Sequence, residues 1–195
     1  MYRYLAPLLM LLVAACAAAP DGPPPRGTEA EIAALTRAIR GLDAAVDPEE
    51  AARAARISYD YSHELALAYQ IVDRPLVHNA KVNRGEKPRG LCWHWAEDME
   101  KRLLAEDFRT LDMHRGIANS DSLILIDHSS AIISARGAPM ADGIVLDPWR
   151  KGGVLYWGAV REDTRYPWKP RMQVLREQGR INYVTSEGIP VAAMN

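Results

Sequence analysis

The spacing of apolar residues changes once along the chain, near residue 105, and this change constrains the fold more than any other feature of the sequence. Before that point, apolar side chains recur every three or four residues, which is the period of an amphipathic helix. Beyond it, short runs rich in Ile, Leu and Val alternate with turns that contain Gly and Pro, a pattern typical of strands. Helices followed by strands predict an α+β fold, with N-terminal helices packed on an antiparallel sheet.

Three helical segments are expected in the first half of the chain, at residues 29–42, 48–72 and 92–104. The second begins clearly, because Asp47 is a good N-cap and Pro48 suits the first helical position. Pro75 is expected to end it, since the residue before a proline disfavours helical geometry. The residues that follow, 76–91, are then predicted to form a polar loop.

The second half of the chain is expected to form strands at residues 110–117, 123–135, 144–149, 154–160 and 181–184, with a short helix at 172–178. Gly137, Pro139 and Gly143 mark a turn between the second and third of these strands. The two strands are therefore predicted to form a hairpin.

The N-terminus carries a short apolar segment that ends Leu12-Val13-Ala14-Ala15-Cys16. It is shorter than the span of about 20 apolar residues that crosses a bilayer, and it fits a secretory signal. Its ending resembles the bacterial lipobox, in which small residues precede a cysteine. The resemblance implies a lipoprotein signal peptide at residues 1–15 and a lipid anchor on Cys16. Ala17 after that cysteine implies a place at the outer membrane of the cell envelope, facing the periplasm.

Residues 16–28 are rich in proline and small side chains, which predicts an extended tether between the anchor and one domain at residues 29–195. Hydrophobic residues make up 48% of the chain and charged residues 25%, the balance of a soluble globular domain. The formal net charge is -1 and there is no basic run, so nucleic acid is not an expected partner. The composition does not indicate an oligomeric state.

Cys92 is the candidate nucleophile. The chain has two cysteines, and acylation of Cys16 would leave Cys92 without a disulfide partner, which in an exported protein suggests a reactive thiol. Cys92 also follows Gly90 at the expected start of a helix. The helix dipole and the unpaired backbone N–H groups there favour a thiolate and could donate to an oxyanion.

A cysteine nucleophile needs a base, and the base needs an orienting partner. His128 and Asp147 fall roughly opposite each other in the expected hairpin, within two or three residues of register. Asp147 could then accept a hydrogen bond from one ring nitrogen of His128 while the other nitrogen faces the sulfur. His94 is expected to point away from Cys92, because residues two apart diverge on a helix, whereas His114 stays open as a second candidate base.

Two further hypotheses concern the surroundings of Cys92, a substrate cleft and a metal site. Trp95 and Trp149 are candidate walls of a substrate cleft, although aromatic side chains also dominate core packing. A zinc site would need its ligands on one face, and the chain has neither a CxxC nor an HExxH element. We therefore expect no metal and no cofactor.

The motifs G-L-C-W at residues 90–93, D-H-S-S-A-I-I at 127–133 and G-I-V-L-D-P-W at 143–149 occur in the order Cys, His, Asp. This order resembles the bacterial transglutaminase-like cysteine proteinases of the papain-like superfamily, over roughly residues 75–155. The resemblance implies a papain/transglutaminase-like fold and thiol acyl chemistry. A Cys92 thioester would form by cleavage of a peptide or amide bond and would then pass its acyl group to water or to an amine.

The sequence departs from papain at one point, because Glu86 stands near the position of papain's oxyanion-donating glutamine. Asn83, Asn79 or a backbone amide would have to replace that donor. Two alternatives also stay open: a peptidoglycan endopeptidase of the NlpC/P60 type, and a non-catalytic envelope protein that keeps the fold as a binding or scaffolding module. The expected partners are the membrane, through Cys16, and a peptide or protein substrate, for which the location suggests the peptides of peptidoglycan.

Overall fold

The computed structural model describes residues 22–180, and within them the helices precede the strands as expected. The prediction of an α+β fold with helices packed on an antiparallel sheet is confirmed. The helices are α2 (Glu29–Arg40), α3 (Pro48–Ala68), α4 (Pro75–Asn83), α5 (Cys92–Leu104) and α6 (Arg171–Glu177). The strands are β1 (Leu111–Ala118), β2 (His128–Ala135), β3 (Ile144–Lys151), β4 (Val154–Ala159) and β5 (Lys169–Pro170). The signal segment, Cys16 and the strand expected at 181–184 lie outside the described residues.

Helices α2 and α3 begin at side-chain caps that are visible in the sequence. Thr28 and Glu31 form a capping box at the start of α2, and the Asp47 carboxylate accepts from the backbone N–H groups of Glu49 and Glu50 at the start of α3. Such caps satisfy backbone donors that the first helical turn would otherwise leave without partners.

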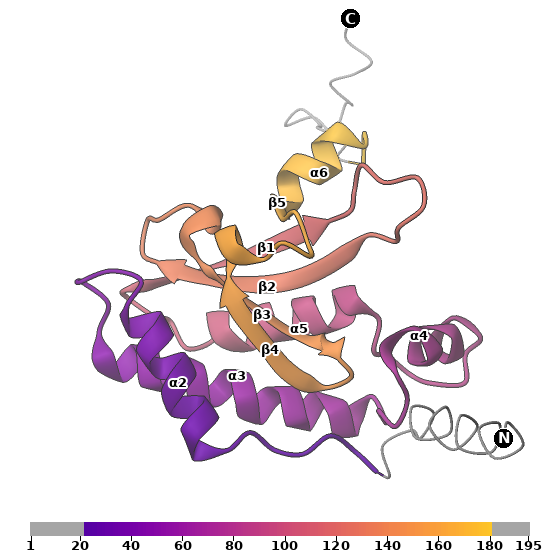
Figure 1. The fold of residues 1–195 in the computed structure, drawn as a ribbon, viewed down its shortest axis with the longest axis horizontal. Coiled ribbons are helices and arrows are strands. Elements are labelled where there is room, and N and C mark those ends of the chain that lie inside the picture. The colour runs from indigo at the N-terminus through magenta and orange to yellow at the C-terminus, as the bar shows by residue number, and fades with distance from the viewer. Residues whose placement is uncertain (1–21, 181–195) are drawn as a thin grey trace, which may run out of the picture.

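The five strands form one antiparallel sheet in the order β4-β3-β2-β1-β5. Helices α2, α3 and α5 gather on one side of this sheet, and α6 lies beyond its other side, next to β5 (Figure 1). The main core lies between the three helices and the sheet, where Leu35, Met99, Ile133 and Leu146 are fully buried. A smaller cluster around Ile132 and Val145 covers the opposite face of the sheet.

The hairpin of β2 and β3 has the predicted form. Ala131 lies opposite Leu146, and continuing this register places Asp147 opposite Ser130, two residues from His128. Side chains two residues apart on a strand share a face, so His128 and Asp147 are diagonal neighbours on one face of the sheet.

Two segments differ from the expectation. Residues 75–83 form α4 instead of a loop, because Pro75 occupies the first position of a new helix, where a missing N–H has no cost. The strand expected at 123–135 begins only at His128, because β1 ends opposite that residue, at Ala118. Residues 123–126, Leu-Ile-Leu-Ile, therefore lie in an exposed connection, and we call them the apolar loop.

The last part of the predicted tether belongs to the folded domain. Pro24 is buried, and its carbonyl oxygen accepts from Nδ1 of His63 on α3 at 2.9 Å. Gly153, in the turn between β3 and β4, also approaches Pro24 so closely that a side chain there would collide with its ring. Between residues 22 and 180, none of the helices has the length and apolar character needed to cross a membrane.

Candidate active site

Cys92 is the first residue of α5, and the backbone before it is tightly held. Gly90 has a φ of +122°, and a Cβ atom there would lie 2.4 Å from Nε2 of His78, so glycine is required on both counts. The N–H groups of Gly90 and Leu91 donate to Nδ1 of His94, at 3.1 and 3.2 Å. His94 thus supports the loop that carries the nucleophile, and burial lowers the pKa of its ring, which favours the neutral form that accepts these bonds.

His78 and Trp95 hold the same loop through hydrogen bonds to its backbone carbonyl groups. His78, which falls in the segment predicted to be a polar loop, is buried on α4, and its Nε2 lies 2.8 Å from the carbonyl oxygen of Arg89. Trp95 is 1% exposed, and its indole N–H donates to the carbonyl oxygen of Gly90 at 3.0 Å. Trp95 is therefore a packing residue beneath the site and not a wall of a cleft, because its helix face points into the core.

His128 and Asp147 are hydrogen-bonded and fully buried. Nε2 of His128 lies 2.7 Å from Oδ2 of Asp147, and each side chain is at most 2% exposed. The bond uses one ring nitrogen and fixes the orientation of the imidazole. The second nitrogen, Nδ1, is buried and makes no hydrogen bond of ordinary geometry within residues 22–180.

Cys92 lies beside the remaining side of the His128 ring. Burial by itself would lower the pKa of His128, but the hydrogen bond to Asp147 and the neighbouring Cys92 thiol outweigh burial and raise this pKa to about 9. The sulfur of Cys92 also lies 3.7 Å from the carbonyl oxygen of Asp127, the residue before His128. The structure therefore brings together Cys92, His128 and Asp147 in the order that a thiol nucleophile, a base and an orienting carboxylate require.

Asp147 is held in turn by Arg150, which the sequence analysis did not single out. The Arg150 side chain donates from Nε to Asp147 at 3.0 Å and from Nη2 to Asp163 at 2.6 Å. Asp163 also accepts from the indole N–H of Trp168 at 2.9 Å, and burial of this carboxylate is outweighed by these partners, so its pKa is lowered. Arg150 follows Asp147 by three residues, a spacing that carried no recognisable signal before the fold was known.

Three aromatic rings surround the imidazole. The centroids of Tyr166, Trp149 and Trp168 lie 4.4, 4.7 and 5.3 Å from that of His128. Trp149 is fixed by Asn79 of α4, whose Oδ1 accepts from the indole N–H at 3.0 Å. The rings keep bulk water from the His128–Asp147 pair, which strengthens electrostatic interactions within it.

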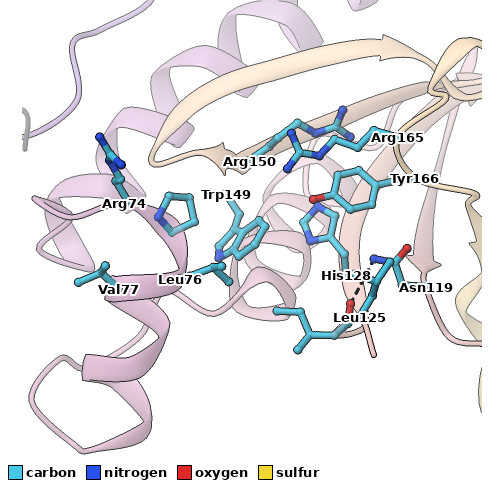
Figure 2. A pocket seen from close by; sticks show the side chains of 12 residues that line it. Arg74, Leu76, Val77, Asn119, Leu125, His128, Trp149, Arg150, Arg165 and Tyr166 are labelled. Atoms are coloured by element: carbon cyan, nitrogen blue, oxygen red, sulfur yellow. Dashed lines mark hydrogen bonds between the residues drawn. The ribbon is translucent and has the colours of Figure 1, made fainter. Parts of the chain in front are cut away.

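Two cavities of different chemistry open on either side of the pair formed by Cys92 and His128. One, of about 540 Å³, is mainly apolar; Figure 2 shows His128, Trp149, Leu76 and Leu125 around it. We call it the apolar cavity. The other, of about 320 Å³, is lined by Cys92 and Ser129 and by three arginines, Arg115, Arg171 and Arg180. We call it the arginine cavity. Cys92 lines only the arginine cavity, and His128 lines only the apolar one.

The predicted oxyanion donors are placed unequally. Asn83 is exposed in the last turn of α4 and lines neither cavity, and Glu86 pairs with Arg84 on the surface. Asn79 reaches the site only through Trp149. Cys92, Trp93 and Ser129 do border the arginine cavity. Within the described chain, the backbone N–H groups of Cys92 and Trp93 and the hydroxyl of Ser129 donate to no other group. These are better placed as donors than either asparagine.

The geometry does not support His114 as the base or a zinc site at Cys92. Nε2 of His114 lies 2.8 Å from the Ser134 hydroxyl on β2, and His114 lines neither of the two cavities beside Cys92. Across residues 22–180, no group of three or more His, Cys, Asp or Glu side chains is arranged to hold a metal ion.

Comparison of the chain with protein-family models, with curated proteins and with solved structures found no match in any of the three.

Proposed function

We propose that this protein is an envelope lipoprotein that cleaves or transfers peptide or amide bonds through a thioester on Cys92. The observation that carries the proposal is the 2.7 Å bond from His128 to Asp147, together with a Cys92 thiol close enough to raise the pKa of His128. A papain/transglutaminase-like identity of the fold, the anchor on Cys16 and a peptide substrate are parts of the same proposal.

The chemistry follows from the protonation of His128. With a pKa near 9, the ring is an imidazolium at neutral pH, and a positive charge beside Cys92 stabilises the thiolate that attacks a carbonyl carbon. The imidazolium then gives its proton to the leaving amine, and the thioester remains on Cys92. Water or another amine attacks the thioester, His128 takes up the proton, and the thiolate is restored. Asp147 keeps the charged ring oriented throughout.

Alkylation by iodoacetamide at pH 6 tests this proposal on a full chain in which Cys16→Ala leaves Cys92 as the one thiol. We expect Cys92 to react at least about tenfold faster than a free thiol at this pH, because an ordinary thiol is almost wholly protonated there. The Asp147→Asn variant should lose this advantage. Slow alkylation without dependence on Asp147 would instead indicate the non-catalytic binding or scaffolding protein.

A further inference from the structure

The two cavities are placed to bind different parts of a substrate, the acyl group in one and the leaving group in the other. In a thiol acyl transfer the carbonyl carbon becomes bonded to sulfur, and the departing atom receives its proton from the base. The acyl half must therefore lie next to Cys92, and the leaving half next to His128. Since His128 lines the apolar cavity and Cys92 lines the arginine cavity, the leaving half lies in the apolar cavity.

We propose, as an inference that rests on the proposed function, that the apolar cavity is the subsite for the leaving amine and for an acceptor amine that replaces it. The amine that it takes carries a hydrocarbon chain. An acceptor enters by the route by which the leaving group departs, because the forward and reverse steps pass through the same transition state.

The walls of the cavity support this specificity. Leu76 and Val77 reach it from α4, and Leu125 and Ile126 reach it from the apolar loop, a segment far from α4 in the sequence (Figure 2). All four side chains are exposed, although large apolar side chains at a surface gain free energy when they are covered. Four such residues from two chain segments meeting beside His128 indicate an apolar ligand rather than chance exposure.

Charge also favours a hydrocarbon chain over a cationic one. The described lining residues of the apolar cavity include Arg150 and Arg165 but no Asp or Glu. The Arg150 guanidinium is engaged by Asp147 and Asp163. A chain that ended in a second ammonium group would meet positive charge without a carboxylate partner.

The step balances without an added oxidant or metal. The free amine attacks the carbonyl carbon of the Cys92 thioester, a C–N bond forms, and the C–S bond breaks. The sulfur leaves as thiolate, and the proton lost by nitrogen passes to His128. The product is an amide, and the enzyme returns to its starting protonation state.

The experiment uses the acyl-enzyme formed by p-nitrophenyl acetate on the full chain with Cys16→Ala. The acyl-enzyme is divided between water and added methylamine, n-hexylamine or 1,6-diaminohexane, and the amides are quantified by mass spectrometry. Burial of a methylene group is worth about a fourfold preference, so even partial burial of the chain should favour hexylamine over methylamine by at least about tenfold. 1,6-Diaminohexane should lose most of that preference, because its second end is charged.

Leu125→Asp is the test variant and Leu104→Asp is its matched control, since the two leucines are 60% and 53% exposed and Leu104 lies at the end of α5, away from the apolar cavity. Leu125→Asp should abolish the preference of the acyl-enzyme for hexylamine over methylamine. Leu104→Asp should keep that preference.

The outcomes separate this inference from the proposed function. Formation of the acyl-enzyme with equal use of all three amines would overturn the inference and leave the proposed function standing. A Leu125→Asp variant that keeps the full preference for hexylamine would also overturn it, because that result would place the amine outside the apolar cavity. Failure to form any acyl-enzyme would overturn both.

Discussion

The apolar cavity and the arginine cavity meet the same pair of reactive groups but are built in different ways. The apolar cavity has exposed aliphatic side chains at its mouth and an aromatic interior at Trp149 and Tyr166. The arginine cavity is smaller, and its Arg171 and Arg180 have no carboxylate partner in the described chain. One side therefore selects by burial of hydrocarbon, and the other can select by charge.

The comparison shows how one fold gives two chemical environments to one reaction. The start of α5 lies at the arginine cavity, whose arginines come from β1, from α6 and from the residues after α6. α4 and the apolar loop instead bring hydrocarbon to the cavity beside the imidazole. His128, Asp147, Arg150 and Asp163 form a buried chain of charges, and two of its members, His128 and Arg150, line the apolar cavity.

Asp147→Asn should have the largest effect, because it removes the charge that orients and stabilises the His128 imidazolium. We expect the rate of Cys92 acylation to fall by about 10²- to 10⁴-fold. With the charge of Asp147 gone, the pKa of His128 should fall from about 9, because burial is then opposed by Cys92 alone, and NMR titration of the imidazole can follow this fall. An unchanged titration would contradict the assigned partnership.

Arg150→Met should have the next largest effect, and this effect is on the stability of the folded protein. It leaves the carboxylates of Asp147 and Asp163 buried without their common partner, and loss of one member of a buried ion pair costs about 3–5 kcal/mol of unfolding free energy. Arg136→Met is the control, since its ion pair with Asp112 is exposed and such pairs contribute about 0–1 kcal/mol. Equal urea midpoints for the two variants would show that the buried chain of charges does not stabilise the fold.

The folded protein should lose stability as the pH rises through the range in which His128 titrates. The pKa of His128 is about 9 in the folded state and about 6.5 when unfolded, so the folded state holds the proton more tightly. The contribution is complete below pH 6.5 and is lost toward pH 9, a change of about 3 kcal/mol. Urea unfolding at a series of pH values measures it, and Asp147→Asn should abolish the slope; a slope that persists in that variant would assign the effect to other groups.

Ser129→Ala should have the smallest effect and should separate the two cavities kinetically. Loss of this candidate oxyanion donor should slow both formation and hydrolysis of the thioester by about 10²-fold, because both steps pass through an oxyanion. Leu125→Asp should instead change which amine the acyl-enzyme uses. A Ser129→Ala enzyme with normal rates would leave the backbone N–H groups of Cys92 and Trp93 as the donors.

Much of this arrangement was predictable from local patterns. The start of α5 at Cys92 followed from Gly90 and the apolar spacing after it, and the offset between His128 and Asp147 followed from a turn with strong Gly and Pro signals. These features depend on residues close together in the sequence, where capping and turn rules act.

The other features of the fold and the site could not be predicted, because they depend on tertiary contacts. α4 was missed because Pro75 was interpreted only as the end of a helix, although proline is equally suited to begin one. The apolar loop was predicted to be a strand because its residues have high β propensity, but it pairs with no strand within residues 22–180. The contacts of Arg150 with Asp163 could not be inferred either, since they join residues brought together by the folded chain after β3.

Intact-mass analysis of the protein after mixing with p-nitrophenyl acetate tests the central claim most directly. The account predicts one acetyl group on Cys92, formed in a burst with release of p-nitrophenol, and no burst in Cys92→Ala. Acetyl groups found on lysines alone, at equal rates in the two proteins, would contradict the assignment of Cys92, His128 and Asp147 as a catalytic unit.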